Sequence, residues 1–203
     1  MAGSAAPAAA PIGRLSKEGR REQLLDAAAE LVVERGVAAL TMEGLAERAG
    51  VSKALPYQHF DNAGAVLIAL YGREIGLLGR RVYEAVDGVQ DPEARVRAAI
   101  HAYFDIVAER GRVLGAFTGA GSNGAAEADG GARTGVAFVA ELLVKPFGFS
   151  GSRATALASM FLGTLGGATD SWAHGDAGRR STEAVLASVI IGGLRCASVE
   201  RTV

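Results

Sequence analysis

The sequence predicts an all-α protein, and three observations lead to this prediction. Apolar residues recur at helical spacing along most of the chain. Glycine residues or an Asp-Pro pair mark the breaks between the periodic segments. No segment of any length alternates apolar and polar residues, which is the pattern of a half-buried strand. We therefore expect a unit of three short helices near the N-terminus, followed by a larger helical body.

The first predicted helix covers residues 19–35. Its apolar positions recur at i, i+4, i+7 and i+8, and they are Leu24, Ala28, Leu31 and Val32. Gly36 follows directly, at the position where many helices end in a residue with positive φ. Thr41 precedes the next helical segment, and its hydroxyl is a favourable N-cap.

The second helix is predicted to end at Gly50, and the third to run from Ser52, another N-cap residue, to Phe60. Gly50 suits a sharp turn because it accepts a positive φ without steric cost. Leu45, Val51 and Phe60 are the apolar residues expected to hold the third helix against the first two. A tri-helical unit with a glycine turn between its second and third helices is the helix-turn-helix pattern.

The rest of the chain is predicted as helices separated by short breaks. Asp61-Asn62 caps a fourth helix over residues 62–81, and Asp91-Pro92-Glu93 begins another that runs to about Gly111. The Gly/Ala/Ser-rich stretch 118–131 has no period and is predicted as a loop. The remaining predicted helices cover residues 132–146, 151–174 and 180–199.

Isolated residues and missing patterns exclude several classes of protein. Cys196 is the only cysteine, so an internal disulfide and a cysteine zinc cluster are excluded, and a reducing cytoplasm suits the chain. No uninterrupted apolar run reaches the roughly 18 residues of a membrane helix, and the Ala/Pro-rich start, Met1–Pro11, does not resemble a secretory signal. The three histidines share no ligand spacing. With no catalytic motif either, we expect no enzyme activity, no metal and no cofactor.

Residues Arg21 to Leu70 resemble the TetR family of bacterial transcription regulators. The resemblance rests on a combination of short motifs, which are Ala27-Ala28, Gly36, Leu40-Thr41, Leu45-Ala46, Ala49-Gly50-Val51-Ser52 and Tyr57-Gln58-His59-Phe60. It implies a cytoplasmic homodimer whose helix-turn-helix binds a palindromic operator in double-stranded DNA. It further implies a repressor that a small-molecule effector releases from the operator.

The resemblance assigns DNA contacts to eight residues. They are Thr41, Ser52, Lys53, Ala54, Leu55, Tyr57, Gln58 and His59. Thr41 would bind a phosphate, and Lys53 would reach a phosphate or a guanine edge. Tyr57 and His59 would touch the DNA backbone, which leaves Ala54, Leu55 and Gln58 nearer the bases. A basic lead-in of Arg14, Lys17, Arg20 and Arg21 would follow the phosphates or enter the minor groove, unless it is only a solvated face.

Other interpretations of these residues stay open. Phe60 is expected in the core, and Tyr57 also suits a core position. Lys53 and His59 also suit a solvated or structural position. Pro56 stands where the family usually has an apolar non-proline residue, and inside a helix it costs about 3 kcal/mol. Ala63 replaces a lysine that is common after Phe60 in the family. The alternative function is therefore a helical ligand-binding dimer that no longer binds DNA.

The C-terminal half is expected to form the dimer and a ligand pocket. Its last two helices carry apolar stripes and several glycines, and the resemblance implies that they form a four-helix bundle with a second copy. The expected pocket residues are His101, Phe104, Asp105, Phe117, Phe138 and Trp172, each of which also suits an ordinary core position. The predicted domains are an N-terminal arm (1–18, disordered and basic-ended), a helix-turn-helix domain (19–65) and a ligand-binding and dimerisation domain (66–203). Ligand bound in the body would shift the fourth helix and change the spacing of the two DNA-reading heads.

Overall fold

The structure is a computed structural model that describes residues 15–118, 135–175 and 177–199. Within these ranges it contains helices and turns but no strand, which confirms the all-α prediction. The main helices are α1 (Lys17–Arg35), α2 (Met42–Arg48), α3 (Ala63–Val86), α4 (Pro92–Thr118), α6 (Gly151–Ala173) and α7 (Arg179–Val199). No described helix combines the length and apolar character of a bilayer-crossing segment.

Short polar side chains begin several of the helices at the positions expected from the sequence. The hydroxyl of Thr41 accepts a 3.0 Å hydrogen bond from the N–H of Gly44, and the amide oxygen of Asn62 accepts one of 3.0 Å from Ala65. The carboxylate of Asp91 likewise accepts from Ala94 at 2.7 Å. Each bond satisfies a backbone N–H that the first turn of a helix leaves without a partner. α1 begins two residues earlier than predicted because Ser16 caps it, accepting from Gly19 at 3.0 Å.

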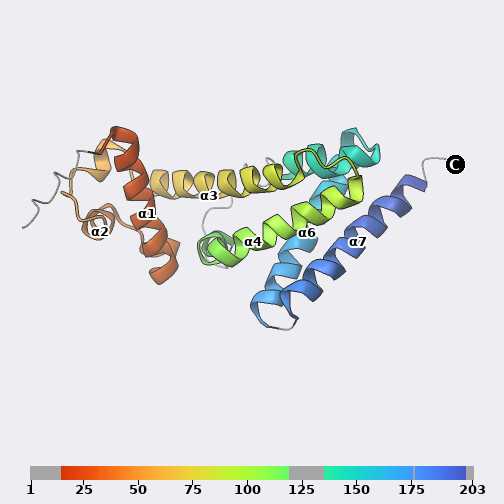
Figure 1. Cartoon of the computed structure of the whole chain (residues 1–203). Helices are drawn as coiled ribbons and strands as arrows, with labels where there is room; N and C mark the ends of the chain where they lie inside the picture. The colour runs from red at the N-terminus through yellow and green to blue at the C-terminus, as the bar shows by residue number, and fades with distance from the viewer. Residues whose placement is uncertain (1–14, 119–134, 176, 200–203) are drawn as a thin grey trace, which may run out of the picture.

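The described residues contain two hydrophobic cores, and α3 contributes side chains to both. Figure 1 shows α3 running from α1 toward the helices of the C-terminal part. Val66 and Leu70 of α3 are fully buried with apolar residues of α1 and α2 in the smaller core. Farther along α3, Val82 and Val86 belong to the larger core, which α4, residues 139–144, α6 and α7 complete. The predicted boundary between residues 65 and 66 therefore falls near the start of a helix that extends into both parts. We call the part around the smaller core the head and the remainder the body.

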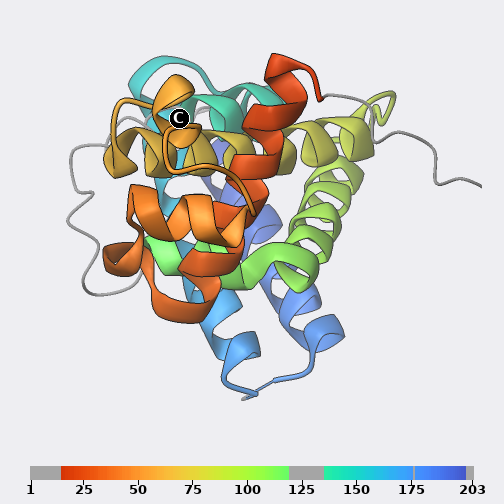
Figure 2. The same cartoon turned by 90° about the vertical axis from the view of Figure 1, so that its left-hand side faces the viewer.

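In the body, α4 packs along α3 and against α7, while α6 and α7 lie side by side (Figures 1 and 2). Phe104 is completely buried at the centre, with its ring centroid 5.6 Å from Tyr103 and 5.4 Å from Trp172. The predicted end of this helix at Gly111 is wrong, since α4 continues to Thr118. Gly111 is tolerated inside the helix because Val113, one half-turn farther on, is buried in the smaller core and stabilises the extension.

The segment before α6 departs from a regular helix. Residues 135–139 are α-helical, but Ala140–Val144 widen to a π-turn and Lys145–Phe147 tighten to a 3₁₀-turn. Pro146 lacks the N–H that would bond to the carbonyl of Leu142 in an α-helix. The guanidinium of Arg95 on α4 donates to this carbonyl at 3.4 Å and thereby ties the segment to α4. The predicted loop 118–131 lies outside the described residues, apart from Thr118 at the end of α4.

Candidate nucleic-acid interface

The turn after α2 is built by backbone hydrogen bonds around Gly50. The N–H of Gly50 donates to the carbonyl of Glu47 at 3.1 Å, and the N–H of Val51 donates to that of Ala46 at 3.0 Å. This pair of bonds is the Schellman ending of a helix, which needs a left-handed residue at its centre. Gly50 supplies it with φ of +65°. The glycine turn predicted from the sequence is therefore confirmed.

The segment after this turn is not the α-helix that the sequence predicts over residues 52–60. Residues 53–55 form a turn closed by a 3.0 Å bond from the N–H of Leu55 to the carbonyl of Ser52, and Pro56–Gln58 form a single 3₁₀-turn. The cause is Pro56, which has no N–H to donate to the carbonyl of Ser52 four residues earlier. Pro56 instead occupies the first position of the 3₁₀-turn, where a missing N–H costs nothing, and its ring is buried.

All eight predicted contact residues lie in the head, which faces the viewer in Figure 2. Thr41, Ser52, Lys53, Ala54, Tyr57 and Gln58 are exposed, whereas Leu55 and His59 are half-buried. Tyr57 keeps 54% of its surface exposed, which is high for an aromatic residue. Phe60 is 5% exposed and belongs to the core, as predicted.

Three residues of α1, whose supporting role no pattern in the sequence indicates, hold the contact segment in place. The amide nitrogen of Gln23 donates to the carbonyl of Ala49 at 3.0 Å, and Arg20 donates to the amide oxygen of Gln23 at 2.6 Å. Arg21 places its guanidinium 4.6 Å from the ring centroid of Phe60, a cation–π contact. Two members of the predicted basic lead-in thus make contacts inside the protein, whereas Lys17 is exposed and Arg14 lies outside the described residues.

α2 is fixed to α1 by charge as well as by apolar packing. Arg48, at the end of α2, forms ion pairs with Glu30 at 3.1 Å and with Glu34, both on α1. Leu45 and Ala46 of α2 are buried against α1. Exposed ion pairs of this kind contribute little individually, so the packed core supplies most of the stability and the arginine restricts the orientation of α2.

Residues 24–70 match the sequence model of bacterial regulatory proteins of the tetR family. The similarity to this family therefore lies in the N-terminal part of the chain. The activator FasR of Mycolicibacterium smegmatis is 42% identical over 94 residues, which are 46% of this chain and 43% of FasR. The matched region thus spans less than half the length of that relative.

Solved structures extend the similarity to the whole TetR fold. The fatty acid degradation regulator FadR from Bacillus halodurans has a TM-score of 0.72 at 21% identity, covering 89% of this chain and 99% of FadR. The SmeT–triclosan complex has a TM-score of 0.69 at 19% identity, covering 86% of this chain and 90% of the other. At these identities the structures establish the shared fold and no more.

In the TetR-type body, the six expected pocket residues do not form one cluster. Phe104 is part of the core, Phe138 and Trp172 pack against that core, and the side chain of Phe117 lies outside the described residues. His101 and Asp105 lie on α4, where they face α7. His101 contacts the carboxylate of Glu183 at 3.1 Å, and Arg179 bridges Asp105 and Glu183.

Arg179 also shifts the acid–base properties of the two carboxylates that it bridges. Its hydrogen bond lowers the pKa of Asp105 below the ordinary value. Burial alone would raise the pKa of Glu183, but hydrogen bonds from Arg179 and His101 outweigh burial and lower it. Both groups are therefore held in their charged form, as suits a structural ion-pair cluster. The described residues contain no group of three potential metal ligands.

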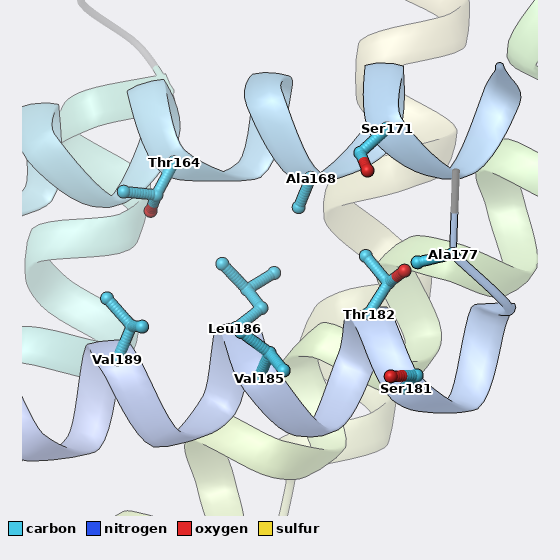
Figure 3. Close-up of a pocket in the computed structure, with 9 residues that line it drawn as sticks. All are labelled: Thr164, Ala168, Ser171, Ala177, Ser181, Thr182, Val185, Leu186 and Val189. Carbon is cyan, nitrogen blue, oxygen red and sulfur yellow. The ribbon is translucent and has the colours of Figure 1, made fainter. Parts of the chain in front are cut away.

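A groove of about 320 Å³ lies instead between α6 and α7 (Figure 3). Thr164 and Ala168 line it from α6, whereas Thr182, Val185, Leu186 and Val189 line it from α7. None of the six expected pocket residues contributes to its wall. The wall combines apolar side chains with a few hydroxyls. Two of these hydroxyls already donate to backbone carbonyls, Thr164 to Phe161 of α6 and Thr182 to Gly178 just before α7.

Proposed function

We propose that the chain is a transcriptional repressor that binds a palindromic operator as a homodimer. Binding of a small ligand would release it from that operator. The observation that carries the proposal is the exposed set of contact residues on a firmly supported head. Lys53, Tyr57 and Gln58 are exposed beside buried Pro56 and Phe60. A rigid support is what the reading of base edges needs, because these hydrogen bonds tolerate little displacement.

The proposed dimer would use α6 and α7. Met160, Val185 and Val189 are 65%, 61% and 56% exposed, an unusual degree for such large apolar side chains. On the same helices, added Cβ atoms at Gly163, Gly166, Gly167, Gly192 and Gly193 would meet no described neighbour within 4 Å. These glycines would let the helices of a second copy approach closely. Two-fold symmetry would then place two heads on adjacent half-sites, about 34 Å apart.

The proposed ligand would bind in the body. FadR is named as a regulator of fatty acid degradation and SmeT was solved with triclosan. The centre of this body is rich in aromatic side chains, with Phe104 against Tyr103 and Trp172, and Phe138 packs against the same core. We therefore expect a mainly apolar effector. FasR is named as an activator, so the sign of regulation has to be measured directly.

DNA binding is tested by selecting sites from a random-sequence library and from the DNA upstream of the gene, and by measuring the affinity at several salt concentrations. Lys53→Ala should weaken binding and reduce the slope of log K against log salt by about one, because one phosphate contact is lost. Tyr57→Phe should weaken binding through the missing hydroxyl. Lys145→Ala, a change at an exposed lysine of the body, is the matched control.

A folded protein that selects no site at low salt would overturn the proposal. That result would favour the alternative function, a ligand-binding dimer without DNA contact. Pro56 and Ala63 support this alternative, because both depart from the family pattern in or beside the expected DNA-contact segment. Calorimetric binding of small apolar molecules by such a protein would then identify what it recognises.

A further inference from the structure

A buried carboxylate lies at the place where head and body meet. Glu74, near the middle of α3, is the only charged residue in the described ranges that is buried, with 1% of its side chain exposed. Arg110 of α4 holds it with two parallel hydrogen bonds, one from Nε to Oε2 and one of 2.6 Å from Nη2 to Oε1. This two-point geometry fixes orientation as well as distance.

Arg73 continues this contact from α3 to α1. Its Nη2 donates to Oε1 of Glu74 at 3.2 Å, and its Nη1 donates to Asp26 at 2.8 Å and to Glu22 at 3.1 Å. Glu22 and Asp26 belong to α1 in the head, whereas Arg110 lies on α4, most of which packs in the body. We call these five residues (Glu22, Asp26, Arg73, Glu74 and Arg110) the ionic joint, and together they connect three helices.

The same part of α3 is weak as a helix. Gly72, Gly76 and Gly79 lie between Leu70, which is anchored in the smaller core, and Val82, which is anchored in the larger one. Each glycine in a helix interior costs about 1 kcal/mol relative to alanine. No described atom lies within 4 Å of a Cβ added at Gly72 or Gly79, and at Gly76 only the flexible end of Arg80 does. Close packing therefore does not require these glycines.

Apolar packing does not replace the ionic joint at this level of the molecule. A polar groove of about 580 Å³ runs between α1 and α3, and all five joint residues line it. Charged groups in fixed directions thus act here beside the apolar contacts of Leu78 with the larger core and of Val113 with the smaller one.

We propose that Arg73, Glu74 and Arg110 are positioning residues that set the angle of the head on the body, and that Gly72–Gly79 is the flexible segment that they hold. This inference rests on the proposed function, because the angle would set the distance between the two heads of a dimer. Apolar contacts slide more easily than paired charges, so loss of the joint frees the angle without unfolding either core.

The first experiment measures the angle without DNA. Spin labels on Glu47→Cys in α2 and Ala94→Cys in α4, both at exposed positions, report the distance from head to body in a Cys196→Ala background. Labelled protein is diluted with unlabelled protein, so that only distances within one chain are recorded. The parent should give one narrow distribution, and Glu74→Gln and Arg110→Met should give broad ones. An unchanged narrow distribution in both variants would overturn the proposal.

Two further variants keep the experiment decisive if a single change reduces folding. Glu74→Met combined with Arg110→Met replaces the buried pair by apolar groups, a change that often preserves stability. It should remain folded and still give a broad distribution. Gly72→Ala with Gly79→Ala should narrow that distribution again, because the helix stiffens. The control is Arg195→Met, which breaks the exposed pair of Arg195 with Glu93 away from the joint.

The second experiment uses selected operators with altered half-site spacing. The parent should prefer one spacing, whereas the joint variants should bind that spacing about tenfold more weakly and show a flatter preference. Equal spacing preference in parent and variants would overturn the link between the joint and the operator. If the parent binds no DNA, the proposed function fails while the distance measurement still decides whether the joint sets the angle.

Discussion

The side-chain amide of Gln23 donates a 3.0 Å hydrogen bond to the backbone carbonyl of Ala49, which lies 26 residues later in the chain. Ala49 is the last residue before the left-handed Gly50, so this bond joins α1 to the turn that leads into the contact segment. Arg20 donates to the other end of the same amide at 2.6 Å and fixes its orientation. Gln23 therefore helps to hold the contact residues in place without touching DNA itself.

Gln23→Met should reduce DNA affinity while the head stays folded. The substitution keeps the length of the side chain but removes both hydrogen bonds, at a cost of about 1 kcal/mol in unfolding free energy. Fluorescence anisotropy with a selected operator measures the affinity, and urea denaturation measures the stability. Gln90→Met, at an exposed glutamine outside the helices, is the control. Unchanged affinity in Gln23→Met would show that the bond has no positioning role.

Pro56→Ala should convert the contact segment toward a regular helix. Alanine supplies the N–H that can bond to the carbonyl of Ser52, and this would lengthen the helix by about one turn. Loss of the buried proline ring opposes the gain, so we expect a stability change within about 1 kcal/mol. Amide hydrogen exchange should show new protection at residue 56, and site selection should return an altered operator. No protection at residue 56 would mean that tertiary packing, not proline, sets the 3₁₀-turn.

Glu74 should make part of the free energy of unfolding depend on pH. Burial by itself raises the pKa of its carboxyl, but the hydrogen bond and charge of Arg110, together with Arg73, outweigh burial and lower it. The folded state then binds its proton at lower pH than the unfolded state does. The stabilisation is complete well above pH 4.5, the ordinary glutamate value, and is lost as pH falls below it.

Urea unfolding of parent and Glu74→Gln across pH 3 to 7 checks this acid dependence. The parent should exceed the variant by roughly 3 kcal/mol near neutral pH, and the difference should shrink as the pH drops below 4.5. Glu47→Gln, at an exposed carboxylate, serves for comparison. A difference that is independent of pH would contradict the assignment.

Val189→Glu should break the proposed dimer. Val189 is 56% exposed on α7, and a carboxylate there would be buried without a partner between two copies. Tyr83→Glu on α3 changes an apolar residue of almost equal exposure, 54%, away from α6 and α7. Light scattering should find a dimer for Tyr83→Glu and a monomer for Val189→Glu. A Val189→Glu protein that remains dimeric would place the interface elsewhere.

Local features of the chain are well predicted by the sequence, because they depend on residues a few positions apart. Thr41, Asn62 and Asp91 begin their helices as expected, and each bonds to an N–H only three residues away. Gly50 makes the expected turn for the same reason. Tyr57 is exposed and Phe60 is buried, as the resemblance implied.

Contacts between distant residues were decided by the tertiary structure alone. Arg73 meets Glu22 across 51 positions, and no spacing in the sequence distinguishes that pair from other surface charges. The sequence predicts DNA contacts for Arg20 and Arg21, yet in the structure Arg20 bonds to Gln23 and Arg21 lies over Phe60. α4 likewise passes Gly111 because Val113 reaches the smaller core.

The sequence by itself thus determined the all-α class, the starts of several helices and the glycine turn at Gly50. The tertiary structure decided the 3₁₀ geometry around Pro56, the division of α3 between two cores and the burial of Glu74 among arginines. The physical reason is the separation, along the sequence, of the residues that interact. Caps and turns are stabilised by bonds within about one helical turn, whereas burial and long-range ion pairs depend on which helices pack together.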